Sequence, residues 1–92
     1  MKYLVVIGDI ISSREIEDRK LLQLRLNNIL NEIKQHEDAP LSPYTITLGD
    51  EFQAVYQQAD SLFLHAFSIL EEVFPHRIRF SFGLGNISTE LN

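Results

Sequence analysis

The order of apolar and polar residues along the chain predicts four strands and two helices. A continuous apolar run over 3–7 is typical of a strand buried on both faces. Apolar and polar residues alternate over 44–48 and again over 78–82, which predicts strands with one buried face. Residues 52–56 are expected to form the strand that returns antiparallel to 44–48. The two longer segments between strands carry apolar residues at helical spacing, which predicts the two helices.

The first predicted helix follows a turn over 9–15. Ser12-Ser13-Arg14-Glu15 has the pattern of a capping box, which predicts the start of this helix, and two prolines within 38–43 end it. Its apolar residues form one stripe at helical spacing: Leu22, Leu26, Ile29, Leu30 and Ile33.

The second predicted helix ends at Pro75 and carries a longer apolar stripe: Ala59, Leu62, Phe63, Ala66, Phe67, Leu70, Val73 and Phe74. We therefore expect the phenylalanines of this helix and of the last strand to lie in the core. The three histidines have no spacing typical of metal ligands, and we expect His36, His65 and His76 on the surface.

The resulting order, βαββαβ, predicts a single α+β domain over 1–92 with the ferredoxin-like or palm arrangement. In this fold an antiparallel sheet carries two helices on one face. The first two strands run parallel and the third lies between them, so the carboxyl end of the first strand meets the hairpin that joins the next two.

Acidic residues stand at both of these places. Asp9 follows the first strand, and Gly49-Asp50-Glu51 forms the predicted hairpin. Carboxylates packed closely together repel one another unless a proton or a cation intervenes. We therefore expect Asp9, Asp50 and the backbone carbonyl of Ile10 to bind Mg²⁺ or Mn²⁺, with Glu51 as a further ligand or as a base acting on a hydroxyl.

A phosphate group needs hydrogen-bond donors beside such a cation. Backbone N–H groups of Ile11, Ser12 and Ser13 stand at the start of the predicted helix, and Arg14 offers a guanidinium. The pattern favours a nucleoside triphosphate as the ligand, with phosphoryl or nucleotidyl transfer as the chemistry.

A purely structural interpretation accounts for the same residues. Gly49-Asp50 is a favoured turn pair, the two serines are ordinary helix caps, and Arg14 can pair with Asp18 one helical turn away.

Composition narrows the choice of partner. The net charge is −5 and the pI about 5.0, so the basic surface typical of nucleic-acid binding is missing. There are no cysteines and no apolar run of membrane-spanning length. We expect a cytoplasmic protein that binds neither nucleic acid nor membrane.

The helix-free face of the predicted sheet, polar around an apolar centre, favours docking of a second copy or of a further domain.

Two motifs carry a family resemblance. Residues 8–14, Gly-Asp-Ile-Ile-Ser-Ser-Arg, and residues 45–53, Thr-Ile-Thr-Leu-Gly-Asp-Glu-Phe-Gln, resemble the SatD family of bacterial proteins, whose biochemical role is unassigned. SatD proteins are usually longer, so the resemblance implies that this chain is an N-terminal domain.

A more distant likeness is to class III nucleotidyl cyclases and GGDEF diguanylate cyclases, in which the positions of Asp9 and Asp50 bind two metals. The last four letters of GGDEF match residues 49–52, and residues 82–85 resemble the fourth strand of those enzymes. Leu48 replaces the first glycine of GGDEF and Ile46 replaces a base-selecting lysine. The resemblance therefore implies metal binding and triphosphate binding more strongly than cyclisation, and a degenerate, regulatory docking module is the alternative.

Overall fold

The computed structural model describes residues 2–11, 17–47 and 51–86. Six elements follow one another in the order that the sequence predicts, and their bounds are β1 (Lys2–Ile10), α1 (Arg19–Gln35), β2 (Ser42–Ile46), β3 (Glu51–Tyr56), α2 (Ala59–Val73) and β4 (Ile78–Asn86).

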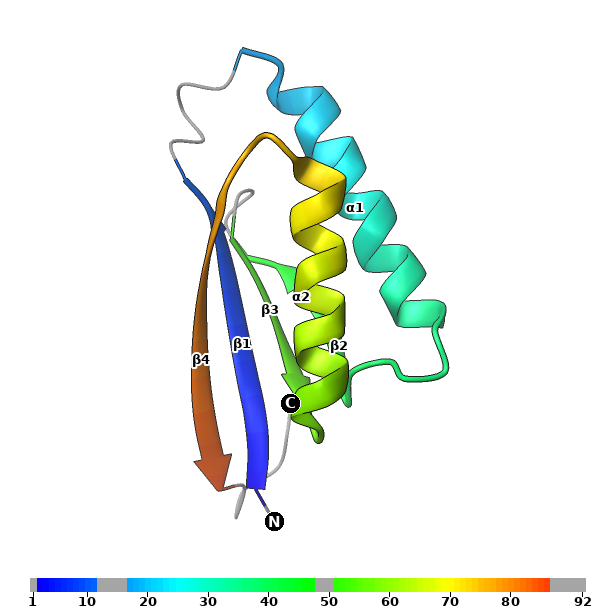
Figure 1. Ribbon diagram of the computed structural model, residues 1–92, viewed down its shortest axis with the longest axis vertical. Helices are drawn as coiled ribbons and strands as arrows, with labels where there is room; N and C mark the ends of the chain where they lie inside the picture. The colour runs from blue at the N-terminus through cyan, green and yellow to red at the C-terminus, as the bar shows by residue number, and fades with distance from the viewer. Residues whose placement is uncertain (1, 12–16, 48–50, 87–92) are drawn as a thin grey trace.

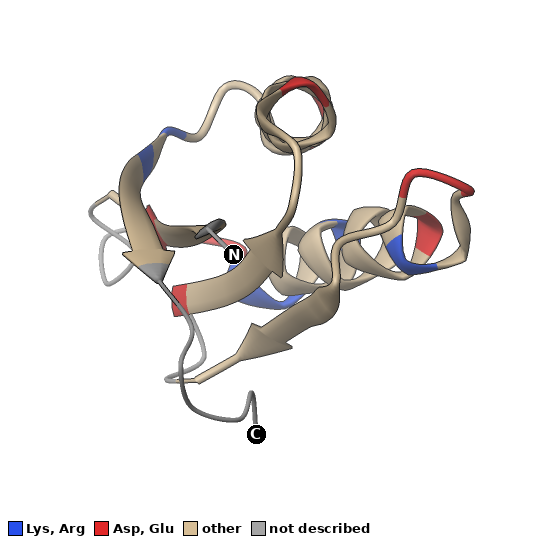
Figure 2. Cartoon of the chain, turned by 90° about the horizontal axis from the view of Figure 1, so that it is seen from below, with Lys and Arg blue, Asp and Glu red and all other residues tan. Residues whose placement is uncertain are grey.

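The four strands form one antiparallel sheet in the order β2-β3-β1-β4. Both helices cover the same face of this sheet, as Figures 1 and 2 show. The ferredoxin-like α+β fold is therefore confirmed, including the place of β3 between β1 and β2. Neither described helix has the length and apolar character needed to cross a membrane.

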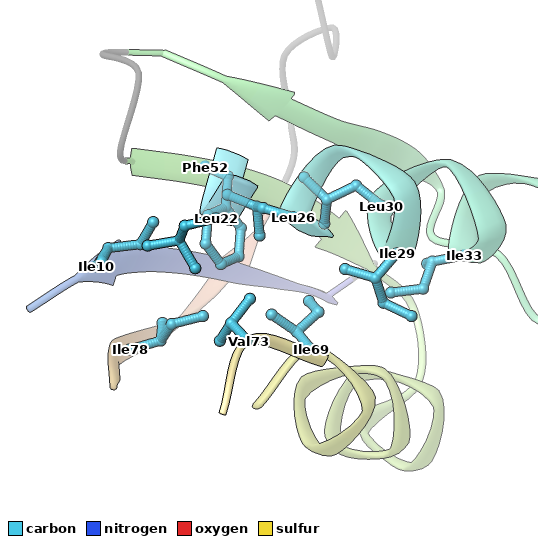
Figure 3. Close-up of a cluster of buried hydrophobic side chains, with 10 residues drawn as sticks. All are labelled: Ile10, Leu22, Leu26, Ile29, Leu30, Ile33, Phe52, Ile69, Val73 and Ile78. Atoms are coloured by element: carbon cyan, nitrogen blue, oxygen red, sulfur yellow. The ribbon is translucent and has the colours of Figure 1, made fainter. Parts of the chain in front are cut away.

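The core lies between the sheet and the two helices (Figure 3). The stripe predicted on α1 is buried in full, and α2 contributes Ile69 and Val73. Side chains from three strands meet these helices: Ile10 of β1, Phe52 of β3 and Ile78 of β4. Each alternates with a polar or half-buried neighbour on the other face, as the period of two in a strand requires.

Phe52 and Gly8 are direct partners across β3 and β1. The Phe52 ring is fully buried and contacts the rings of Tyr44 and Phe80, at centroid distances of 5.7 and 6.1 Å. A Cβ atom on Gly8 would lie 2.5 Å from Cε2 and 2.9 Å from Cε1 of that ring. The glycine of the first motif therefore makes room for the phenylalanine of the second.

The start of α1 differs from the prediction. The helix begins at Arg19, and Asp18 caps it by accepting a hydrogen bond of 3.1 Å from the Leu21 amide. An aspartate at this position satisfies an amide that has no partner within the helix. The predicted start at Ser12 was therefore wrong by about two turns, because Asp18 supplies a competing cap directly before the buried stripe.

The end of β1 also differs. Asp9 was expected to open a turn, but β1 continues through Ile10, whose side chain enters the core. Asp9 consequently lies inside the sheet with strands on both sides of it.

The buried face of α2 is turned by about one residue from the prediction. Its buried residues are Leu62, His65, Ala66, Ile69 and Val73. Phe63, Phe67 and Phe74 are exposed by 49%, 67% and 74%. Two parallel apolar stripes run along this helix, and the periodicity alone could not tell which of them faces the sheet.

His65 is buried, contrary to the expectation that it lies on the surface. Its Nδ1 lies 2.7 Å from the hydroxyl oxygen of Tyr56, which in turn donates a hydrogen bond of 3.1 Å to the Tyr44 hydroxyl. Burial raises the pKa of both tyrosines, so both phenols stay neutral. Within the described residues, Nε2 of His65 is buried without a hydrogen-bond partner.

We predict that Gly8→Ala lowers the free energy of unfolding by about 1–3 kcal/mol, because the added methyl group overlaps a fully buried ring that is packed against two others. Gly83→Ala is the matched control: its Cβ would meet nothing within 4 Å, so stability should stay within about 0.5 kcal/mol of wild type. Urea unfolding followed by circular dichroism measures both. Equal effects of the two substitutions would contradict the packing account.

The buried histidine predicts a pH dependence of stability. Burial lowers the pKa of His65 below its usual 6.5, the neighbouring His36 lowers it further, and Asp38 opposes the shift. Below pH 6.5 the unfolded chain then binds a proton that the folded chain excludes. This histidine therefore does not change the free energy of unfolding with pH above 6.5. As the pH falls below 6.5, the free energy of unfolding falls by at most about 1.4 kcal/mol per pH unit. The free energy of unfolding, measured in urea at several pH values, should depend less steeply on pH in His65→Gln than in wild type. An equal pH dependence in the two proteins would refute the assignment.

Candidate functional site

Asp9 and Glu51 form a direct cross-strand pair between β1 and β3. They follow the Gly8–Phe52 pair by one residue, so they lie on the helix-free face of the sheet. Both are half-buried. Directly opposite residues in an antiparallel pair have Cβ atoms about 4.5–5.5 Å apart, a distance at which two carboxylates repel. The convergence of the two sequence motifs is thus a feature of the strand register.

Thr47 holds the Glu51 side chain. Its hydroxyl donates to Glu51 Oε1 at 3.1 Å and lies 3.4 Å from the Glu51 backbone carbonyl. The backbone N–H of Thr47 donates to the same carbonyl at 2.8 Å, which closes the connection between β2 and β3. One carboxylate oxygen of Glu51 is thereby fixed at the end of the sheet, and Thr47 joins the candidate site as a positioning residue.

Arg79 of β4 is the partner of Asp9 on its other side. It is exposed and shares the helix-free face with Asp9 and Glu51. A negative, a negative and a positive side chain therefore stand in a row across three neighbouring strands. The position of Arg79 beside Asp9 was not predicted, because the pairing register of β4 with β1 cannot be read from either strand alone.

The remaining predicted ligands divide into two groups. Ile10 lies at the end of β1 with its side chain in the core, which leaves its backbone carbonyl as the candidate ligand. The Ile11 amide donates to the Arg77 carbonyl at 2.9 Å, so a phosphate would compete with that carbonyl for it. Ser12, Ser13, Arg14 and Asp50 lie outside the described residues.

Across 2–11, 17–47 and 51–86 no three acidic, histidine or cysteine side chains gather closely enough to hold a metal ion. The described part of the site is a pair of hard oxygen donors, Asp9 and Glu51. One or two carboxylates, completed by water and by substrate phosphates, are what Mg²⁺ commonly takes from a protein. The described pair therefore has the donor chemistry that Mg²⁺ or Mn²⁺ prefers.

Comparison with known proteins supports the family resemblance. The family model of SatD matches residues 3–92. A search of curated proteins finds no match to the chain. Both motifs, with the Gly8–Phe52 and Asp9–Glu51 pairs that they form, fall inside the matched region. The chain therefore belongs to the SatD family.

Proposed function

We propose that this domain binds a divalent cation, Mg²⁺ or Mn²⁺, together with a nucleoside triphosphate, at the end of the sheet where Asp9 faces Glu51. The observation that carries the proposal is their direct cross-strand pairing on the helix-free face. Two carboxylates side by side destabilise the fold unless something offsets their repulsion. A bound cation offsets this repulsion, and the relief of the repulsion contributes to the affinity for the cation.

Each residue has a stated part in the proposed site. Asp9 and Glu51 would hold the cation, with Asp50 and the Ile10 carbonyl as further ligands. Thr47 engages one Glu51 oxygen, which leaves the second for the cation. We therefore assign Glu51 to cation binding rather than to the role of a base. When bound, the cation would supply positive charge against the phosphates of the nucleotide.

Phosphate groups would also meet cationic side chains. Arg79 is exposed on the same face, in register with Asp9, and can turn its guanidinium toward a phosphate. Arg14, Ser12 and Ser13 keep the role proposed from the sequence. Leu48 and Ile46 stand where the cyclases that this sequence resembles carry nucleotide-fitting residues, so we propose binding and include no cyclisation step.

The alternative function, docking of another domain or chain on the helix-free face, is supported by a different observation. Val5, Ile7 and Val55 form an apolar strip along that face and are half-buried rather than covered. A partner seated there would perturb the amides of this strip, whereas a nucleotide would perturb those near Asp9 and Glu51.

We predict that adding Mg²⁺ and ATP or GTP to the ¹⁵N-labelled chain shifts amide resonances near Asp9 and Glu51 in a saturable way. Mn²⁺ should broaden the same resonances, because its unpaired electrons relax nearby nuclei. Asp9→Asn and Glu51→Gln should abolish both effects, since each removes a charged ligand.

Two conservative changes far from the site serve as matched controls. Asp60→Asn in the first turn of α2 and Glu32→Gln near the end of α1 should leave the titration unchanged. No saturable shift with millimolar nucleotide and Mg²⁺ would refute the proposed function. Shifts that survive in both Asp9→Asn and Glu51→Gln would move the site elsewhere.

A further inference from the structure

The most exposed apolar surface of the described chain lies on the helix-bearing side. Phe63, Phe67 and Leu70 follow one another at i, i+4 and i+7 along α2, next to the stripe that is buried, and Phe74 comes directly after the helix. Phe67 and Phe74 flank a hollow of about 580 Å³ that also involves Leu70 and Glu71. Aromatic side chains left this far in water mark an interaction surface.

The same surface continues onto β4. The rings of Phe63 and Phe82 lie 5.3 Å apart, and Phe82 stacks on Phe80 at 6.0 Å. Phe82 is 48% exposed and Leu84 is 68% exposed. We call this continuous surface the α2–β4 patch, comprising Phe63, Phe67, Leu70, Phe74, Phe82 and Leu84.

The two edges of the sheet differ in how well they are protected from further strand pairing. β2 has five residues, includes Pro43 and has a register irregularity between Ser42 and Thr45. Short strands, proline and irregular register are common ways of blocking an edge. β4, at the opposite edge, has nine residues, contains no proline and pairs with β1 in unbroken register. Its outer side is therefore suited to accept another strand.

We propose that the α2–β4 patch is a dimer interface, in which β4 of one chain pairs antiparallel with β4 of a second copy and extends the sheet to eight strands. A two-fold axis makes a strand antiparallel to its own copy without any other adjustment. Both α2 helices would then stand on the same side of the extended sheet, and their exposed phenylalanine stripes would line the space between them.

The sequence of β4 is compatible with pairing to itself. Full overlap of Ile78–Asn86 places Phe82 on the axis, facing Phe82 of the partner. Phe80 and Leu84 then face each other across the junction on the helix-bearing side. Arg79 faces Gly85, so this alignment does not bring two like charges together.

The area available fits a stable but modest dimer. The exposed fractions of the five exposed residues of the patch correspond to roughly 600 Å² of apolar surface on each copy. Specific interfaces begin near about 600 Å² per partner, and the paired backbone adds to this figure. The patch is thus large enough to hold two copies together, and it leaves the Asp9–Glu51 face open.

Light scattering coupled to size-exclusion chromatography tests the proposal. We predict a mass of twice 10.6 kDa at about 100 μM chain, above the micromolar dissociation constants that interfaces of this size reach. Leu84→Lys should give a monomer, because it places a charge in the junction. Leu24→Lys changes a leucine of α1 that is 55% exposed outside the patch, and it should leave the dimer intact.

Disulfide trapping tests the alignment, because the chain has no cysteine of its own. Phe82→Cys should form an intermolecular disulfide under mild oxidation, and Leu24→Cys should not. A monomeric wild-type chain at this concentration would overturn the proposal. So would a dimer that survives Leu84→Lys, since the interface would then lie elsewhere.

Discussion

The contact between Gly8 and the Phe52 ring is the constraint from which the candidate site follows. A side chain at residue 8 would exclude the ring, and without the ring the core between β3 and the helices would have a large void. This contact pairs the two strands in one register. Because side chains alternate across a sheet, the next residues along, Asp9 and Glu51, must then face each other on the opposite surface.

The two sequence motifs are therefore halves of one structural unit. On the helix-bearing side they provide packing, and on the helix-free side they provide a pair of carboxylates. A glycine in such a motif invites interpretation as a loop or a phosphate-binding residue. Here Gly8 lies within β1, and its contribution is the space it leaves for a ring.

Much of the fold could be predicted from the sequence because the strongest hydrophobic patterns were compatible with a single arrangement. The stripe from Leu22 to Ile33 admits a single buried face, and the order of elements fixes the sheet. The pattern of α2 was compatible with two buried faces, because Phe63 and Phe67 are as apolar as Leu62 and Ala66. The position of His65 could not be foreseen either, because its hydrogen bond to Tyr56 joins α2 to a strand.

For the candidate site, only the order of the strands could be predicted from the sequence. The sequence predicted that Asp9 lies near the hairpin between β2 and β3. The pairing registers of β1 with β3 and β4 determine that Glu51 is its direct partner and that Arg79 flanks it. The contribution of Thr47 was not predicted, since a threonine before a turn gives no sign of which carboxylate it will meet. The α2–β4 patch lies on the other side of the sheet from these residues, so dimerisation and cation binding need not compete.

A double-mutant cycle on Asp9→Asn and Glu51→Gln tests the central claim most directly, because it isolates their mutual interaction from the influence of Arg79. Stability would be measured by urea unfolding without cation and with saturating Mg²⁺. The account predicts an unfavourable coupling of about 0.2–1 kcal/mol without cation and a favourable coupling with it. A coupling of zero under both conditions would show that the two carboxylates neither repel each other nor share a cation, and would contradict the account.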